Sequence, residues 1–201
     1  MIIWGGYGGN ALNTGGTYCA QPSTPIVQRV VSRKTHGGAG SFDVDLPLTG
    51  TPGIECRSGG ATNDYTMVVT FLADVSVTGN PQAAVTSGIG MIGTGGVSNG
   101  GMVTISGNVV TIPLTSVIDA QTINVTLNGV NGSTNVTVPM SILVGDSNGN
   151  GSANASDVSQ TKARVGQIVS ASNFRSDVNA NGSINASDVS AVKSRVGTGL
   201  P

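Results

Sequence analysis

The sequence feature that most constrains the fold is a segment that occurs twice. The first copy spans residues 146–166 and the second spans residues 177–197, and 15 of the 21 aligned positions are identical. Both copies begin Asp-x-Asn-x-Asn-Gly and carry a further aspartate at the twelfth position. Ca²⁺ takes about six to eight oxygen ligands, and a loop of this length supplies them from alternate positions when glycine permits a sharp turn at the sixth. The repeat therefore predicts two calcium-binding loops.

The predicted ligands are the oxygens at positions 1, 3, 5, 7, 9 and 12 of each loop. They belong to Asp146, Asn148, Asn150, Ser152, Asn154 and Asp157 in the first loop, and to Asp177, Asn179, Asn181, Ser183, Asn185 and Asp188 in the second. Each loop has only two carboxylates, and low ligand charge weakens calcium binding. We therefore predict two structural Ca²⁺ ions with a Kd of about 10⁻⁴–10⁻³ M, as in extracellular modules, rather than the affinity of a cytosolic sensor.

A short helix is expected after each loop, ending near Gly166 and Gly197, because glycine is common just beyond a helix end. Neither copy shows the entering helix of an EF-hand. Phe174, between the copies, is expected in the core that separates them. A unit of this size buries little apolar surface by itself, so its folding should be coupled to calcium.

Two such loop–helix repeats, each followed by Lys-x-Arg, resemble the type I dockerin domain. The resemblance covers roughly residues 145–198 of a module expected at residues 145–201, and it departs at position 5, where asparagine stands and aspartate is common. It implies binding to a cohesin, itself a β-sandwich, through positions 10 and 11 and the following helix. The partner-binding residues implied are Ala155, Ser156, Lys162 and Arg164 in the first copy, and Ala186, Ser187, Lys193 and Arg195 in the second. The similarity of the two copies implies docking in two orientations.

The chain before the repeat alternates short β-prone runs with turn signals. Strands are predicted at residues 26–31, 41–48, 64–72, 83–87, 101–106, 109–114, 121–128 and 134–143, with Gly107 and Asn108 closing one hairpin. Residues 26–144 are thus expected to form an antiparallel β-sandwich, which resembles the immunoglobulin-like and cohesin-like modules of bacterial surface proteins. The sandwich runs into the first loop without a flexible linker, which predicts a fixed angle between the two modules.

Residues 1–25 are predicted to be an extended N-terminal arm. Ile2, Ile3 and Trp4 at its tip either fray or anchor the arm in a groove of another copy by strand addition. Cys19 and Cys56 are expected to form a disulfide in an oxidising compartment, within or between chains; two buried free thiols are the alternative.

Composition excludes several functional classes. Nine Lys and Arg against ten Asp and Glu give a net charge of −1, which offers no attraction for nucleic acid, and no apolar run is long enough for membrane insertion. His36, the only histidine, is expected to be a loop residue in the polar segment 33–38. Glu55 is the only glutamate, and no Ser-His-Asp pattern or carboxylate pair within an aromatic cleft is evident, so we expect no enzymatic activity.

These patterns favour an extracellular or cell-surface structural protein, a calcium-stabilised subunit of a filament or matrix. Its partners would be other copies of itself, joined head to tail, or a cohesin-like sandwich. The alternative is a dockerin-bearing binding module, for carbohydrate or a cohesin partner, in a cellulosome-like complex.

Overall fold

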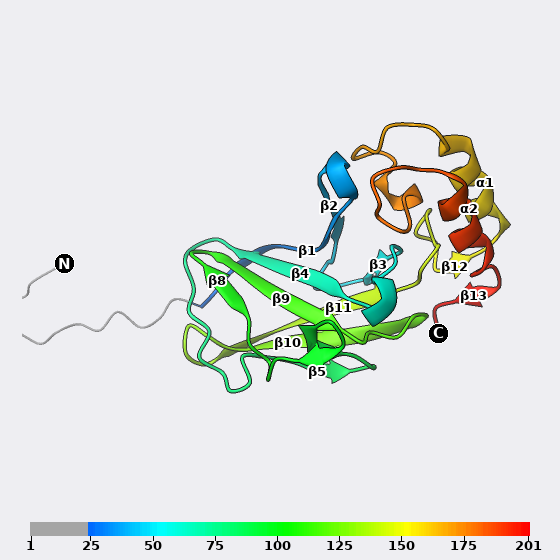
Figure 1. Ribbon diagram of the computed structural model, residues 1–201. Helices are drawn as coiled ribbons and strands as arrows, with labels where there is room; N and C mark the ends of the chain where they lie inside the picture. The colour runs from blue at the N-terminus through cyan, green and yellow to red at the C-terminus, as the bar shows by residue number, and fades with distance from the viewer. Residues whose placement is uncertain (1–23) are drawn as a thin grey trace, which may run out of the picture.

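The computed structural model describes residues 24–201, which form a β-sandwich and a smaller module with two helices (Figure 1). The C-terminal module lies at the end of the sandwich beside β2 (Ser41–Asp45) and β3 (Gly53–Glu55). Most of the predicted N-terminal arm lies outside the described residues, so the predictions for Ile2, Ile3, Trp4 and Cys19 remain predictions. Within residues 24–201, no helix has the length and apolar character needed to cross a membrane.

The larger sheet of the sandwich has the strand order β2-β1-β4-β9-β6-β7, and β8 pairs with β9 outside this path. The strands are β1 (Val27–Thr35), β2 (Ser41–Asp45), β4 (Tyr65–Phe71), β6 (Met91–Thr94), β7 (Val97–Ser98), β8 (Thr104–Ser106) and β9 (Val109–Thr115). Alternate residues of a strand face the same side of a sheet. In β4, Met67, Val69 and Phe71 accordingly face the core and are fully buried.

The smaller sheet has the order β3-β11-β10-β5. Its strands are β3 (Gly53–Glu55), β5 (Ala83–Ser87), β10 (Gln121–Val130) and β11 (Thr134–Ile142). Strands β10 and β11 form the longest hairpin, and β10 buries Ile123, Val125 and Leu127 completely. The inner faces of the two sheets join in one hydrophobic cluster, which confirms the predicted β-sandwich.

All eight predicted strands are present, with ends shifted by a few residues. The hairpin at Gly107 and Asn108 is confirmed by the pairing of Ser106 with Val109. Sequence patterns missed β3, β6 and β7, which are only two to four residues long. One pair, β3 with β11, is parallel, whereas an antiparallel sandwich was expected.

The prediction of a loop at residues 33–38 was wrong in its first half. Arg33, Lys34 and Thr35 continue β1, because they pair with β2 from Asp43 to Ser41. The 3-10 turn η1 (Gly37–Ala39) then reverses the chain, while a second one, η2 (Gly60–Thr62), precedes β4. The exposed residues of β1 are polar, which hides its strand character from a search for apolar runs.

The C-terminal module consists of two loop–helix units. Helices α1 (Ala155–Arg164) and α2 (Ala186–Lys193) follow the two loops, as predicted, and pack against each other. A 3-10 turn, η3 (Phe174–Ser176), precedes the second loop. A two-stranded ribbon of β12 (Ser152–Ala153) and β13 (Thr198–Gly199) ties the first loop to the residues that follow the second copy.

The sandwich and the C-terminal module share one continuous core. Val178 of the second loop and Val192 of α2 belong to the same hydrophobic cluster as the sandwich strands. The backbone also crosses the junction, since Gly145 N–H donates to the carbonyl of Cys56 at 2.9 Å and Ser58 N–H donates to the carbonyl of Val178 at 2.7 Å. Shared apolar burial and crossing hydrogen bonds both support the predicted fixed angle between the modules.

Candidate functional site

The first loop folds around the carboxylate of Asp146. This side chain is completely buried and accepts hydrogen bonds from three backbone N–H groups, those of Gly149, Asn150 and Gly151, at 2.8–3.1 Å. At the other end of the loop, the carboxylate of Asp157 turns back and accepts from the N–H of Asn148 at 3.1 Å. Hydrogen bonds from the loop backbone to its first and last predicted ligands thus close the loop.

The second loop repeats this geometry. Asp177 is buried and accepts from the N–H of Asn181 at 3.1 Å and of Gly182 at 2.8 Å. Asp188 closes the loop by accepting from the N–H of Asn179 at 3.2 Å. Gly182 adopts φ 91° and its counterpart Gly151 adopts φ 85°. Residues other than glycine rarely adopt this backbone conformation, which explains why glycine occupies the sixth position of both loops.

The predicted ligands at positions 9 and 12 also begin the helices. Asn154 caps α1 by accepting from the N–H of Ser156 at 2.8 Å, and Asp157 accepts from the N–H of Asn154 at 3.0 Å. Asn185 and Asp188 form the same reciprocal cap on α2. Such a capping box satisfies N–H groups that have no partner within the helix. Each helix is therefore positioned by the residues that define its loop.

The electrostatics of the loops fit a bound cation. Each encloses two fully buried aspartates, and among the described residues no lysine or arginine side chain forms an ion pair with any of the four. Burial raises the pKa of Asp188, with a further contribution from the negative charge of Asp177. Buried charges in proteins are paired or bind metals. Within residues 24–201, no group of three or more His, Cys, Asp or Glu side chains is placed to hold a metal ion. A calcium ion in either loop would therefore need Asn and Ser oxygens as well as the two aspartates.

The implied docking residues lie on the surface beside the loops. Ala155, Ser156, Ala186 and Ser187 are exposed in the first turns of the two helices, and Lys162 and Lys193 are exposed near their ends. The arginines differ between the copies. Arg164 donates to the Ser176 hydroxyl at 3.2 Å, whereas Arg195 forms an ion pair with Asp119 of the sandwich at 3.3 Å.

His36 was expected to be a loop residue without special function, but it is completely buried where the sandwich meets the second loop. Its Nδ1 lies 2.8 Å from Oδ2 of Asp177, and its Nε2 lies 3.1 Å from Nη1 of Arg57. An arginine can only donate, so Nε2 accepts and the proton sits on Nδ1, which donates to Asp177. Burial lowers the pKa of His36 although the hydrogen bond with Asp177 acts to raise it, and the lowered pKa favours the neutral ring.

Arg57 connects His36 to the interior of the sandwich. Its guanidinium forms a two-point ion pair with Glu55, with Nε–Oε1 at 2.7 Å and Nη2–Oε2 at 2.6 Å, and all four atoms belong to fully buried side chains. It also donates to the carbonyls of Ser32 and Phe42. A chain of buried polar groups thus runs from Glu55 through Arg57 and His36 to Asp177.

Two aromatic rings close this junction. Phe174 stacks on Phe42 of β2 with centroids 5.4 Å apart, and His36 stands edge-on to both rings. The expectation that Phe174 fills the core between the two copies was therefore wrong, because its stacking partner belongs to the sandwich. Arg175, the next residue, donates to the carbonyls of Ile54, Asp146 and Ser147.

Cys56 lies in the same junction, fully buried, with Sγ 3.7 Å from the Arg175 carbonyl oxygen that accepts its hydrogen bond. It carries a free thiol among the described residues, and because Cys19 lies outside them the disulfide stays a prediction. Burial raises the pKa of this thiol to about 11.

A Cys19→Ser variant should therefore resist alkylation at Cys56 in the presence of calcium. The thiolate is the reacting species, and it is scarce and shielded in the folded junction. Iodoacetamide labelling at pH 8 followed by mass spectrometry measures this, with urea-unfolded protein as the fully reactive reference. Labelling of the folded protein as fast as the reference would contradict the structure of the junction.

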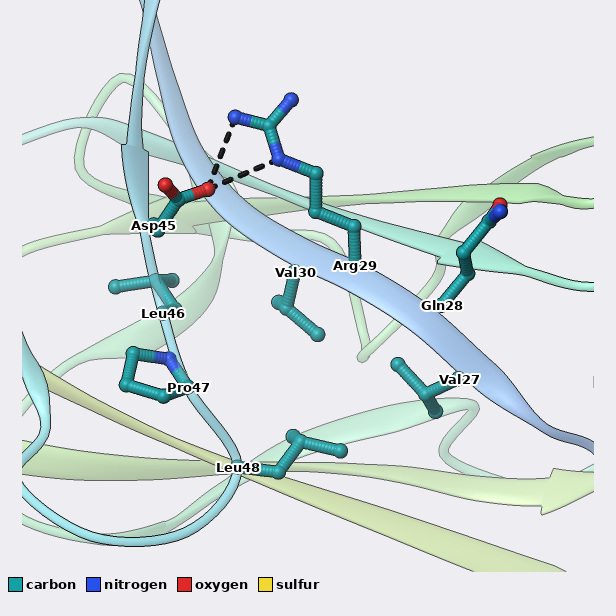
Figure 2. A pocket seen from close by; sticks show the side chains of 8 residues that line it. All are labelled: Val27, Gln28, Arg29, Val30, Asp45, Leu46, Pro47 and Leu48. Carbon is teal, nitrogen blue, oxygen red and sulfur yellow. Dashed lines mark hydrogen bonds and ion pairs between the residues drawn. The ribbon is translucent and has the colours of Figure 1, made fainter.

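A hollow of about 370 Å³ lies beside the first half of β1 (Figure 2). Its apolar lining comes from Val27, Val30, Leu46 and Leu48, and the ion pair of Arg29 with Asp45 lies at its rim. The ladder between β1 and β2 runs from Thr35 to Val31, which pairs with Asp45, so the residues of β1 that precede Val31 lie outside this ladder. The lining contains one carboxylate, that of Asp45, which pairs with Arg29.

Comparison with known proteins addresses the C-terminal module. Residues 144–197 match the family model of the dockerin type I domain. Searches of curated proteins and of solved structures gave no significant match. The match covers both loops and both helices, and with them all twelve predicted metal ligands.

Proposed function

We propose, from the premise that this chain carries a type I dockerin domain at residues 144–197, that it docks through this domain onto a cohesin-type β-sandwich and so joins an extracellular assembly. The observation that carries the proposal is the pair of closed calcium loops, each of which presents an exposed helix start. Type I dockerins bind calcium and cohesins, and they occur in extracellular or cell-surface proteins.

Either copy can serve as the docking face, because Ala155 and Ser156 in one copy and Ala186 and Ser187 in the other are equally exposed. Small side chains at these positions allow a partner strand to approach the helix closely. The side-chain amides of the third loop position support both serines, since Asn148 donates to the Ser156 hydroxyl at 2.8 Å and Asn179 donates to that of Ser187 at 2.7 Å.

Placing a larger neutral side chain on both faces should abolish docking. Ala155→Gln or Ala186→Gln alone leaves one face intact, so each single variant should bind a compatible type I cohesin within about twofold of the wild type. The double variant should lose about 30-fold or more, equivalent to about 2 kcal/mol at a buried interface centre. Isothermal titration against a panel of type I cohesins in calcium measures all three.

Ala171→Gln, at an exposed position between the two copies and outside both helices, is the matched control and should bind as the wild type does. Binding by the double variant at wild-type affinity would show that these faces do not dock. A strong loss in only one single variant would show that one copy alone is the docking face.

The sandwich is proposed to be a structural unit rather than an enzyme. Five of the six carboxylates within residues 26–144 are engaged, the exception being the exposed Asp74: Asp43 and Asp45 pair with arginines on the surface, Glu55 pairs with Arg57, and Asp119 pairs with Arg195. Asp64 accepts from the Thr115 hydroxyl and from the N–H of Gly95. Such engagement leaves no acid–base pair ready for glycoside hydrolysis. The fixed junction suits a spacer that sets the direction of the docking face.

Self-association into a filament is a second candidate, favoured by the unpaired edge of β1 beside the hollow in Figure 2. Residues 2–4 of a neighbouring copy could pair with this edge and place Trp4 in the hollow. Negative-stain microscopy and size-exclusion chromatography of the full chain in calcium test this idea. Filaments that disappear in a Trp4→Ala variant support it, and a monomer at high concentration rejects it.

A further inference from the structure

The two calcium loops differ in how the first aspartate is held, although their sequences are nearly identical. In each loop this carboxylate accepts three hydrogen bonds. In the first loop all three donors are backbone N–H groups of the loop itself, and Gly149 supplies one of them. In the second loop only Asn181 and Gly182 donate from the backbone, and the third donor is His36 of the sandwich.

The backbone of the sandwich also supports the second loop from outside. Gly37, beside His36, lies so close to Asn181 that a Cβ added there would meet the Asn181 carbonyl oxygen at 2.2 Å. A Cβ on Gly182 would in turn meet the carbonyl oxygen of His36 at 2.8 Å. Asn181 and Gly182 are the fifth and sixth positions of the loop, so the turn at Gly37 fits against the part of the loop that must bend most sharply.

The first loop has no such support for its carboxylate. The Arg175 side chain of the C-terminal module bridges this loop to the sandwich, because it donates to the carbonyls of Asp146 and Ser147 and to that of Ile54 in β3. Its sixth glycine, Gly151, has only the end of the Leu200 side chain within 4.0 Å of a Cβ position. Support of the ligand by the sandwich is therefore a property of the second loop alone.

We propose that the β-sandwich completes the second calcium site, with His36 as a positioning residue for Asp177 and Gly37 as the close-packed base of the loop. His36 and the N–H of Gly182 both donate to Oδ2 of Asp177, whereas Oδ1 accepts one hydrogen bond, from Asn181, and keeps a lone pair with which to bind the ion. Partners that orient a metal ligand typically contribute about 10- to 100-fold to metal affinity. Calcium binding at the second loop thus depends on the sandwich, whereas binding at the first does not depend on His36. This inference rests on the calcium binding proposed for both loops.

Loop-resolved calcium titration of the full chain tests the proposal. The N–H groups of Gly151 and Gly182 donate to the first aspartates of their own loops, both at 2.8 Å, so their NMR signals report on each site separately. In His36→Phe, which keeps an aromatic ring beside Phe42 and Phe174 but removes the donor, the calcium midpoint at Gly182 should rise about 10-fold or more. The midpoint at Gly151 should move by less than about threefold. His36→Asn, which restores an N–H donor, should recover part of the loss.

Three glycine variants separate the contact from general strain. Gly37→Ala places a methyl group against Asn181 and should weaken the second site selectively. Gly40→Ala imposes an unfavourable positive φ without any contact within 4 Å, and Gly38→Ala imposes neither, so both should leave the Gly182 midpoint close to that of the wild type.

The outcomes are distinguishable. Equal midpoint shifts at Gly151 and Gly182, or no shift at Gly182 in His36→Phe, would overturn the role of His36. If His36→Phe unfolds the junction, the Gly151 signal and the spectral dispersion of the sandwich change too. The Gly182 midpoints of His36→Asn and Gly37→Ala then decide whether the sandwich supports the second site. A wild-type chain whose two glycines ignore calcium would instead reject the calcium binding on which the proposed function depends.

Discussion

Removing calcium should destabilise the dockerin module and the sandwich together. Each loop encloses two buried aspartates, and without a cation their charges repel each other in an environment that cannot solvate them. At about 10 mM calcium and a Kd of about 10⁻⁴ M, each site stabilises the fold by about 2.7 kcal/mol. Two sites together contribute about 5 kcal/mol, which approaches the entire stability of many domains.

The expected result is a single cooperative transition whose Tm falls by roughly 10–20 °C when calcium is replaced by chelator. The transition should remain single because Val178 and Val192 belong to the same core as the sandwich strands. Thermal scans followed by far-UV circular dichroism for the helices and by near-UV signals for Tyr65 measure both modules. Magnesium at the same concentration is the control, and it should not restore the Tm, because Mg²⁺ loses its water less readily. A Tm that is unchanged by chelation would contradict the prediction.

The loops were predictable because their information is local. All ligands of one site lie within twelve consecutive positions, and the glycine at the sixth position is required by the backbone. The strands were predictable for the same reason, since alternation of buried residues is visible within segments such as Tyr65–Phe71. Both kinds of pattern can be recognised without knowing which segments meet in space.

The junction was not predictable because its partners are distant in sequence. His36 and Asp177 are separated by 141 positions, and Cys56 and Arg175 are separated by 119. A single histidine followed by two glycines gave no sign of burial. One signal was available, namely Glu55 and Arg57 two positions apart, on the same side of an extended chain, in a protein with only 9% charged residues. Opposite charges at that spacing in such a sequence deserve to be considered as a buried pair.

Breaking this buried pair should cost far more stability than breaking an equivalent pair on the surface. Arg57→Met leaves the Glu55 carboxylate buried without its counter-charge, and the expected loss is about 3–5 kcal/mol. Arg33 provides the matched control, because it pairs with Asp43 in the same two-point geometry, at 2.8 Å for both contacts, but is about half exposed. Arg33→Met should cost no more than about 1 kcal/mol. Urea unfolding of both variants in calcium gives the two free energies, and similar losses would contradict the assigned role of burial.

The ion pair of Glu55 with Arg57 should also make the free energy of unfolding depend on pH in the acid range. Burial acts to raise the pKa of Glu55, but the charge of Arg57 and the hydrogen bonds from Arg57 and Ser32 outweigh it, so the pKa lies below its ordinary value of 4.5. A carboxyl group with a lowered folded pKa stabilises the protein fully above the unfolded pKa and loses that contribution as the pH falls through the folded one. The gap in unfolding free energy between the wild type and Glu55→Gln should therefore be constant above about pH 5 and shrink below pH 4.5. Acid also protonates the loop aspartates, but both proteins share that loss, so the difference isolates Glu55. A gap that widens as the pH falls would mean that the folded pKa of Glu55 lies above the unfolded one, which would contradict the stabilisation of its charge by Arg57.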